Sequence, residues 1–216
     1  MIFKDRADAG RQLAGKLVSY KDNGAQVLAL PRGGVPVAFE VARALHAPLD
    51  VFVVRKLGVP GHVELAMGAI ASGGVRVLNE DTLAELRIDE ATLHAVTQAE
   101  MTELQRREHA YRDALPVPDV AHRPVILVDD GLATGASMHA AVLALRALSP
   151  SKIVVAVPVA PAETCANIAQ YVDEMICVAT PEPFRGVGAW YGDFRQVTDE
   201  EVRGMLRSAR DWLHTT

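Results

Sequence analysis

Cysteine is scarce in this chain, since only Cys165 and Cys177 occur among 216 residues. Neither has metal-ligand spacing to other cysteines or histidines, so a disulfide framework or a zinc site is unsupported and we expect two buried thiols. Long apolar runs are also lacking. None approaches the ~20 residues that cross a bilayer, and the N-terminus has no apolar core typical of a signal peptide. We therefore expect a soluble cytoplasmic protein with no membrane partner.

Positive charge is in short supply as well. Lysine and arginine number 22 against 27 aspartates and glutamates, which gives a formal net charge of -5 and a pI of about 5.8. Such a chain has no global basic field to attract nucleic acid, so we expect no nucleic-acid partner. Any anionic ligand must be held locally, by backbone amides and a few cationic side chains.

What the chain does contain is a series of short apolar runs separated by segments with helical spacing. Strands are predicted at Gln26–Leu30, Asp50–Val54, Val125–Val128, Lys152–Val157 and Glu174–Val178. Helices are predicted from Asp5 onward and over Val35–Leu45, Ser137–Leu148 and Ala162–Tyr171. Apolar strands that alternate with helices are typical of a parallel sheet covered on both faces. We predict an α/β fold with a doubly wound, mostly parallel central sheet flanked by helices, in a single domain of residues 1–216.

Two segments fall outside this alternation. Residues 57–123 are predicted as a lid and helical insertion, with a hairpin formed by Met67–Ala71 and Val75–Leu78. Within it, Asp89–Asp113 is predicted as a long amphipathic helix that serves as a surface arm or a dimer prop. Residues 180–216 are predicted as a C-terminal hood and helix segment, since aromatics and glycine concentrate at its start.

The stretch VILVDDGLATGAS, Val125–Ser137, carries the strongest chemical signal. Ligands of parallel sheets collect beyond the carboxyl ends of the strands, which is where Asp129 and Asp130 would lie. The small residues that follow let backbone amides converge on one anion at a helix start, and Thr134 and Ser137 add hydroxyl donors. Carboxylates beside a phosphate loop suit a sugar phosphate, because they accept hydrogen bonds from its hydroxyls. The structural alternative is an ordinary strand-turn-helix link with aspartate caps.

Two other kinds of phosphate loop do not match. A nucleoside-triphosphate P-loop needs a lysine directly before its Ser or Thr, and none precedes Ser137. A dinucleotide fold needs GxGxxG after its first strand, which LPRGGVPVA does not spell.

At these residues the sequence resembles the type I phosphoribosyltransferases, whose signature is an apolar strand, two acidic residues and a loop ending in Thr-Gly-x-Ser/Thr. The likeness extends to a bacterial group of the family that shares RKLG, VATPEPF and a Trp-Tyr pair. It implies a site for 5-phosphoribosyl-1-pyrophosphate (PRPP), in which Asp129 and Asp130 hold the ribose hydroxyls. The residues implied to wrap the 5-phosphate are Ala133, Thr134, Gly135, Ala136 and Ser137.

The resemblance also places a pyrophosphate loop after the first core strand, where LPRGGVPVA stands. Arg32 would supply charge, Gly33 and Gly34 would let amides approach the diphosphate, and the peptide beside Arg32 is often strained or cis in the family. Lys56 is implied as a further cation, with Arg55 as the alternative. A mobile lid is implied after it, with GVPGHVELAMG as a hinge. The catalytic residues implied are Asp129, Asp130, Arg32 and Lys56.

The implied reaction transfers the 5-phosphoribosyl group from PRPP to a nitrogen acceptor, a nucleobase, and releases pyrophosphate. Mg²⁺ is expected to be held mainly through PRPP, so no protein metal ligand is predicted. Ala133 stands where enzymes for 6-oxopurines tend to carry a third acidic residue, which weakens that subclass. Acceptor contacts are predicted at Phe184, Trp190 and Tyr191, which equally suit a sealed core or a dimer contact.

Two further hypotheses stay open. A non-catalytic protein would sense PRPP or a nucleotide with the same pocket and regulate a partner. A hydrolase would use the aspartate pair as general acid and base, but the sequence shows no nearby nucleophile or metal cluster. The partners expected for a phosphoribosyltransferase are PRPP and an acceptor base, and we expect a homodimer.

Overall fold

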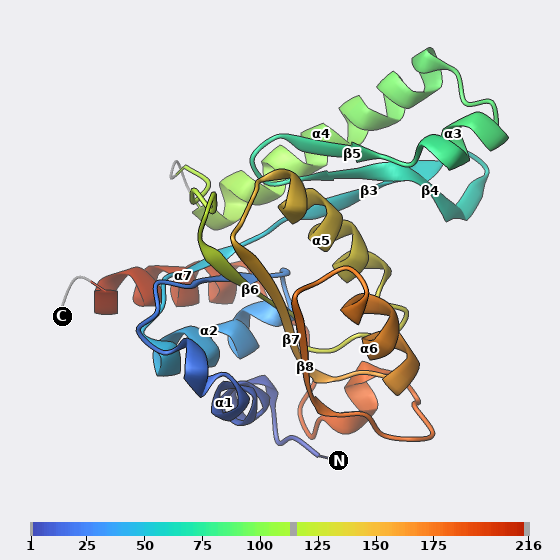
Figure 1. Ribbon diagram of the computed structural model, residues 1–216. Helices are drawn as coiled ribbons and strands as arrows, with labels where there is room; N and C mark the ends of the chain where they lie inside the picture. Colours follow the sequence, from blue (N-terminus) through green and yellow to red (C-terminus); the bar gives the residue numbers. More distant parts are fainter. Residues whose placement is uncertain (1, 113–115, 214–216) are drawn as a thin grey trace.

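The computed structural model describes residues 2–112 and 116–213 and contains a five-stranded sheet with helices on both faces (Figure 1). The strand order is β2-β1-β6-β7-β8, and every neighbouring pair is parallel. The strands are β1 (Gln26–Ala29), β2 (Leu49–Val51), β6 (Pro124–Val128), β7 (Lys152–Val159) and β8 (Glu174–Ala179). The predicted doubly wound, mostly parallel α/β fold is confirmed.

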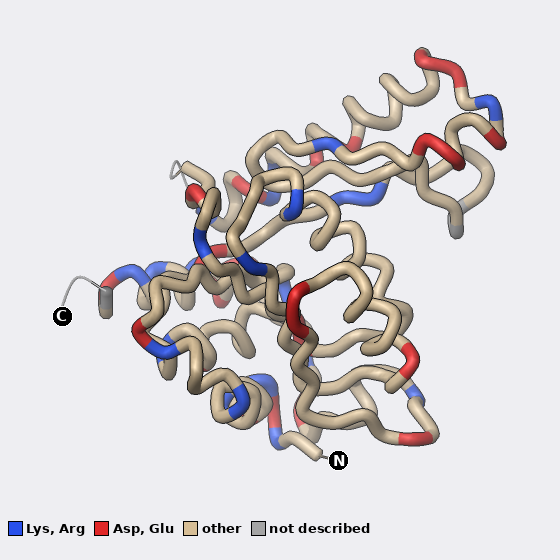
Figure 2. The backbone as a smooth tube through the Cα atoms, in the orientation of Figure 1, with Lys and Arg blue, Asp and Glu red and all other residues tan. Residues whose placement is uncertain are grey.

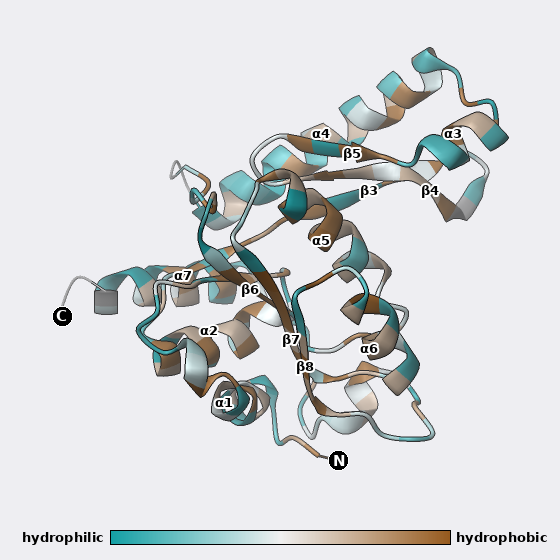
Figure 3. Ribbon diagram, viewed as in Figure 1, coloured by the Kyte–Doolittle hydropathy of each residue, from teal (hydrophilic) through white to brown (hydrophobic). Residues whose placement is uncertain are grey.

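Alternate residues of each strand pack on opposite faces of this sheet, which explains why the strands read as unbroken apolar runs. Val125 and Leu127 join a core cluster beneath α5 (Ala136–Ala147) and α6 (Ala162–Ala169). Their neighbours Ile126 and Val128 join the core on the other face. The helices of that face are α1 (Arg6–Lys16), α2 (Gly34–Leu45) and α7 (Asp199–Leu213). In Figure 3 the strands β6 and β7 are brown over much of their length, as expected for strands buried on both faces.

A second, antiparallel sheet is formed by β3 (Val54–Val59), β4 (His62–Ala71) and β5 (Val75–Leu78). It is followed by α3 (Glu80–Glu85) and the long α4 (Glu90–Arg112), and Figure 1 shows this unit extending to the upper right of the parallel sheet. The predicted hairpin is confirmed, and so is the long helix over Glu90–Arg112; Asp113, the last residue predicted for it, lies outside the described residues. Helix α3 was not predicted, although Asn79 caps it by accepting a hydrogen bond from Thr82 N at 3.1 Å.

The structure corrects one detail of the sequence analysis. The predicted strand Asp50–Val54 is divided, because β2 ends at Val51 in the parallel sheet and Val54 opens β3 in the other sheet. The chain changes sheets between them, where Phe52 N donates to the carbonyl oxygen of Ala29 at 2.9 Å. The stretch predicted as a lid hinge forms most of the β3–β4 hairpin, with Gly61 at φ +79° in its turn, and its role as a hinge stays a prediction.

Charged side chains are dispersed along the chain. Figure 2 shows basic and acidic residues interspersed over most elements, in keeping with the net charge of -5. As predicted, Asp5 caps the first helix, accepting a hydrogen bond from Asp8 N at 2.7 Å. No helix in the described ranges combines the length and the apolar character needed to span a bilayer.

Candidate active site

The carboxyl ends of β1 and β6 lie side by side and bring the two predicted loops into contact. Ala29 and Val128 are partners in the parallel register, and Leu30 N donates to the carbonyl oxygen of Val128 at 2.9 Å. The loop after β1 is residues 30–33, with Gly34 opening α2, and the loop after β6 begins with the aspartate pair. The sequence predicted both loops at one edge of the sheet, and the structure confirms that placement.

Gly33 and Gly34 allow this contact because the end of β6 presses against them. A Cβ atom on Gly33 would lie 2.1 Å from Oδ2 of Asp130. A Cβ atom on Gly34 would lie 2.8 Å from the carbonyl oxygen of Val128 and 2.9 Å from Cα of Asp129. Any larger residue at either position must therefore displace the opposite loop. The Pro31-Arg32 peptide just before them is cis, as the resemblance implied.

Asp129 and Asp130 form a partly buried pair. Asp130 N donates to Asp129 Oδ1 at 2.8 Å, and Arg6 Nε donates to Asp130 Oδ2 at 2.8 Å. Burial, followed by the charge of Asp130, raises the pKa of Asp129 well above its usual range. Burial also raises the pKa of Asp130, while Arg6 opposes that rise. Two adjacent carboxyl groups kept at such a cost indicate a functional site better than simple helix caps do.

Arg6, which the sequence analysis did not single out, is held by three contacts. Besides Asp130, its guanidinium donates to the carbonyl oxygen of Arg195 at 2.8 Å and lies 3.9 Å from the ring centroid of Phe194. Its side chain is 11% exposed and that of Asp130 is 14% exposed. No local motif marks Arg6, because Asp130 lies 124 residues further along the chain.

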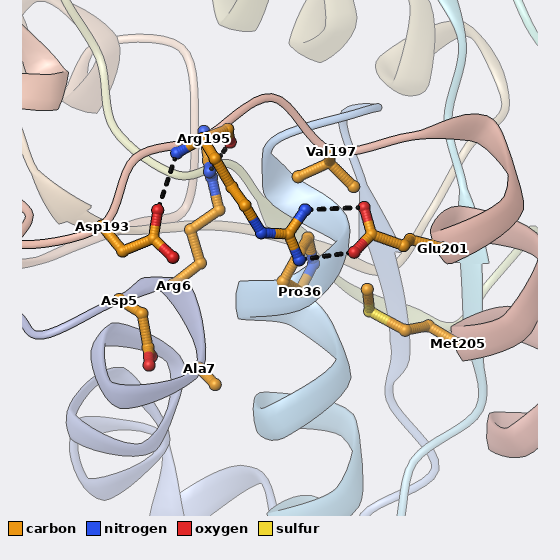
Figure 4. Close-up of a pocket in the computed structure, with 9 residues that line it drawn as sticks. All are labelled: Asp5, Arg6, Ala7, Pro36, Asp193, Arg195, Val197, Glu201 and Met205. Carbon is orange, nitrogen blue, oxygen red and sulfur yellow. Dashed lines mark hydrogen bonds and ion pairs between the residues drawn. The ribbon is translucent and has the colours of Figure 1, made fainter.

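A cavity of about 220 Å³ opens beside Arg6 (Figure 4). Its walls come from the start of α1, from α2 and from the segment that leads into α7. Arg195 closes one side with two hydrogen bonds to Glu201, of 3.0 and 2.5 Å, and its backbone N–H donates to Asp193 at 3.0 Å. The N-terminal and C-terminal segments are therefore joined next to the aspartate pair.

The loop Ala133–Ser137 leads from the aspartates into α5. Thr134, Ala136 and Ser137 are exposed, whereas Gly135 is buried at φ +76°, a left-handed conformation that favours glycine. Because this loop ends at the amino end of α5, its backbone amides meet the positive end of the helix dipole. The predicted phosphate loop thus lies exposed at a helix start, and anion binding by it stays a prediction.

A residue of α6 supports this loop from behind. The hydroxyl of Thr164 donates to the carbonyl oxygen of Ala133 at 2.9 Å, and its methyl group packs against Gly135, where an added Cβ would lie 3.0 Å away. The sequence analysis missed Thr164, since a threonine in a predicted helix carries no motif of its own.

The structure distinguishes the two candidate cations after β2. Successive residues of a strand point to opposite faces, and Arg55 Nε accordingly meets Oε2 of Glu100 on α4 at 2.6 Å. Lys56 is exposed and lines a cavity of about 490 Å³ together with Ala136 and His139 of α5. Lys56, rather than Arg55, therefore lies on the side of the predicted phosphate loop.

Two further cavities border the loops. One of about 310 Å³ lies between α5 and α6 and is lined in part by Thr134, Gly135 and Thr164. Another, of about 380 Å³, is lined by Pro31 and Arg32 together with residues of α4 and α7. Neither of these nor the Lys56 cavity spans both loops. The loops meet through the direct contact of Gly33 with Asp130.

The aromatic residues predicted to contact an acceptor gather around the N-terminal segment. Tyr191 is 5% exposed, its ring centroid lies 5.3 Å from that of Phe3, and its hydroxyl donates to the carbonyl oxygen of Asp130 at 2.5 Å. Burial raises the pKa of Tyr191, so this hydroxyl stays protonated. Phe184 and Trp190 pack partly buried against the same cluster. Tyr191 thus supports the backbone of Asp130 and shows little ring surface, while acceptor contacts by these aromatics stay a prediction.

The carboxyl groups at this edge can be compared with the needs of Mg²⁺. Within the parts of the chain that the structure describes, no three His, Cys, Asp or Glu side chains gather as a metal cage. Mg²⁺ usually binds one or two carboxylates and completes its shell with water and substrate phosphates. Asp129 and Asp130 are two carboxyl groups of that kind, and an Mg²⁺ ion held mainly through PRPP stays a prediction.

These features define a class of protein: a doubly wound α/β domain with an aspartate pair and a small-residue loop before a helix at one strand edge. The family described as phosphoribosyl transferase domain matches residues 2–189, and the chain belongs to this family. The family recognised from the sequence is therefore confirmed.

The chain is similar to proteins from two strains of Mycobacterium tuberculosis whose names propose a phosphoribosyl transferase. Each is 49% identical over 212 residues, which cover 98% of this chain and 48% of the relative, so the chain spans about half the length of these relatives. It is also similar to the crystal structure of TT1426 from Thermus thermophilus, with 42% identity and a TM-score of 0.87. That likeness covers 96% of this chain and 99% of the other.

Proposed function

We propose that this protein transfers the 5-phosphoribosyl group of PRPP to a nitrogen acceptor, a nucleobase, and releases pyrophosphate. Membership of the phosphoribosyl transferase domain family supports transfer of a phosphoribosyl group. The finer proposal is carried by one observation: the loop after β1 lies directly against the aspartate pair, with Gly33 in contact with Asp130. A sugar seated over the aspartates would reach one loop with its 5-phosphate and the other with its diphosphate.

The aspartates are assigned to the ribose. As carboxylates, Asp129 and Asp130 accept hydrogen bonds from vicinal hydroxyls, and such bonds to a charged group are worth about 1.5–3 kcal/mol. Arg6 favours the ionised form of Asp130, and Tyr191 fixes the backbone of the same residue. The 5-phosphate is assigned to the backbone amides of Ala133–Ser137.

The bond that breaks joins C1 of the ribose to the diphosphate oxygen. The electron pair leaves with pyrophosphate, positive charge develops on the ring, and the acceptor nitrogen forms the new bond to C1 and releases its proton to water. Arg32, Lys56 and the amide of Gly33 are assigned to the leaving group. Gly34 N donates to the carbonyl oxygen of Leu30 at 3.1 Å, so Gly34 contributes by its lack of a side chain. When bound through PRPP, Mg²⁺ would add positive charge to the diphosphate.

The acceptor is proposed to lie under the segment that follows β8. Phe184 and Trp190 keep part of their ring surface accessible there, which supports stacking on a flat base. The nearby N-terminal segment is tied to this region, because the backbone N–H groups of Ile2 and Phe3 both donate to the carbonyl oxygen of Trp190 at 3.0 Å.

The test is an acceptor screen with the whole chain, PRPP and Mg²⁺, in which pyrophosphate release is measured for purine and pyrimidine bases. We expect release that depends on one base or a narrow set and that is lost in Asp130→Asn. Tight PRPP binding without turnover on any base would contradict the proposal and support the sensing alternative. Formation of ribose 5-phosphate without a base would support the hydrolase instead. Size-exclusion chromatography tests the predicted homodimer.

A further inference from the structure

The cavity beside Arg32 has walls of unusual composition for an acidic chain. It encloses about 380 Å³ and is lined by three arginines, one tyrosine, one aspartate and a proline. The lining residues are Pro31, Arg32, Arg106, Arg107, Tyr111 and Asp199. Arg32 comes from the loop after β1, whereas Arg106 and Arg107 come from α4, a helix that the phosphoribosyltransferase signature does not include.

From this cavity we propose that Arg106 and Arg107 of α4 complete, with Arg32, a binding site for a diphosphate group. The group is either the diphosphate of a donor such as PRPP or free pyrophosphate. That the diphosphate belongs to a donor such as PRPP depends on the proposed function. That the site binds an anion depends only on the arginines that line it.

The two arginines of α4 are oriented by one shared carboxylate. Glu103, one helical turn earlier, accepts from Nε and Nη2 of Arg106 at 2.7 and 3.0 Å and from Nε of Arg107 at 2.7 Å. These hydrogen bonds from Arg106 and Arg107 lower the pKa of Glu103 to about 2, so it is a carboxylate at neutral pH. One negative charge holds two guanidiniums in place and leaves a net positive charge, which is a preorganised arrangement for an anion.

The remaining carboxylate of the wall binds its partners weakly. Oδ1 of Asp199 lies 3.4 Å from Nη1 of Arg32 and 3.3 Å from the hydroxyl oxygen of Tyr111. Charge-assisted hydrogen bonds usually measure about 2.7–2.9 Å. Arg32 can therefore turn toward an incoming phosphate at little cost, and Tyr111 can donate to it.

The end of α4 is fixed to the parallel sheet, so the site is rigid. Arg112 is 3% exposed, and its guanidinium donates to Asp50 at 2.9 Å and to the carbonyl oxygen of Val51 in β2. Residues 103, 107 and 111 recur every four positions and so share one face of the helix. The β2 anchor holds that face toward the loop after β1.

Three guanidiniums suit a diphosphate better than a single carboxylate or a monoester phosphate. Each presents a planar fork of N–H donors that matches phosphate oxygens, and a diphosphate offers oxygens on two phosphorus atoms. The site also includes Pro31 and Arg32, so a ligand bound there would lie next to the loop that carries Gly33.

The test measures binding of inorganic pyrophosphate, ribose 5-phosphate and PRPP by calorimetry, each with Mg²⁺ and with EDTA. In the double variant Arg106→Gln/Arg107→Gln we expect pyrophosphate affinity to fall by about tenfold or more, because charge-assisted hydrogen bonds are lost. Ribose 5-phosphate affinity should stay unchanged. PRPP affinity falls as well if the donor is the source of the diphosphate, and stays unchanged if the site takes free pyrophosphate.

Two comparisons separate a binding role from a structural one. Arg203→Gln removes a charge from α7, where Arg203 pairs with Glu200 at 2.9 Å outside the cavity, and should leave all three affinities unchanged. Glu103→Gln removes the carboxylate that orients both arginines, so it should weaken pyrophosphate binding, though less than the double variant does. Equal pyrophosphate affinity in the double variant and the wild type, or no pyrophosphate binding by the wild type, would overturn the site. Equal loss of ribose 5-phosphate affinity would also overturn it. If the protein transfers a phosphoribosyl group to no base but still binds pyrophosphate through the arginines, the proposed function is refuted and the diphosphate site stands.

Discussion

The loops at the ends of β1 and β6 differ from the β3–α4 unit in how their geometry is set. The loops are placed by the register of a parallel sheet, so each functional residue lies within a few positions of a strand end. The β3–α4 unit is placed by contacts between distant segments, such as Arg55 with Glu100 and Arg112 with Asp50. The first kind of site can be recognised from local sequence. The second kind supplies the α4 arginines, whose positions only the fold reveals, and the fold also distinguishes Lys56 from Arg55.

The largest effect is expected where the two loops touch. Gly33→Ala would place a Cβ 2.1 Å from Asp130 Oδ2, an oxygen that Arg6 already holds. We expect the fold to lose about 1–3 kcal/mol, as in other overpacked sites, and PRPP binding to be abolished. Thermal unfolding and calorimetry measure the two effects.

Gly204→Ala is the matched control for that change. Gly204 lies within α7, and a Cβ there meets nothing within 4 Å. Helix propensity predicts a gain of about 0.5–1 kcal/mol in stability and no change in PRPP affinity. Normal PRPP binding by Gly33→Ala would show that the two loops do not act on one ligand.

The next effect concerns the sugar contacts. Asp130→Asn should leave the fold intact and weaken PRPP binding by about 1.5–3 kcal/mol, because hydrogen bonds to a charged acceptor are lost. Calorimetry with PRPP measures this directly. An affinity equal to that of the wild type would remove Asp130 from the site.

The Asp129 carboxyl group is expected to lower the stability of the fold while it strengthens PRPP binding. Its pKa in the folded protein is raised above the ordinary value of 3.8 by burial and by Asp130. Between those two values the folded protein binds more protons than the unfolded chain, so the free energy of unfolding falls as pH rises through that window. Asp129→Asn should flatten this decline and raise the Tm at pH 7 while weakening PRPP binding. A lower Tm at pH 7, with the wild-type pH dependence retained, would contradict the assignment.

The smallest effect on PRPP affinity is expected at β3, where variants of two neighbouring cations can be compared. Lys56→Gln should weaken PRPP binding by up to about 1 kcal/mol with no loss of stability, since Lys56 is exposed. Arg55→Gln should leave PRPP affinity unchanged and cost up to about 1 kcal/mol of stability, because the partly exposed pair with Glu100 is lost. The reverse pattern in calorimetry and thermal unfolding would assign the role to Arg55.

The sequence predicted the parallel sheet and both loops because buried strands and glycine-rich turns leave local patterns. It missed the division of Asp50–Val54, since Phe52 and Val53 are as apolar as strand residues, while Phe52 bonds to Ala29 of β1 and Val53 to Ser72 in the turn after β4. It also missed Arg6 and Thr164, whose partners Asp130 and Ala133 are distant along the chain. Residues that act by supporting other residues carry no motif.

Tyr191 illustrates a further limit. A sequence shows that aromatics concentrate after β8, but only the fold shows which of them are packed. Tyr191 is buried against Phe3, while Phe184 and Trp190 remain partly accessible. Composition therefore located the region and left the choice among its side chains open.

A crystal structure of the whole chain with PRPP and Mg²⁺ tests the central claim most directly. The account predicts one ligand molecule across the β1 and β6 strand ends, with its 5-phosphate at Ala133–Ser137, its ribose at Asp129 and Asp130, and its diphosphate at Arg32, Gly33 and Gly34. Density for the ligand in a cavity that touches only one of the two loops would contradict it.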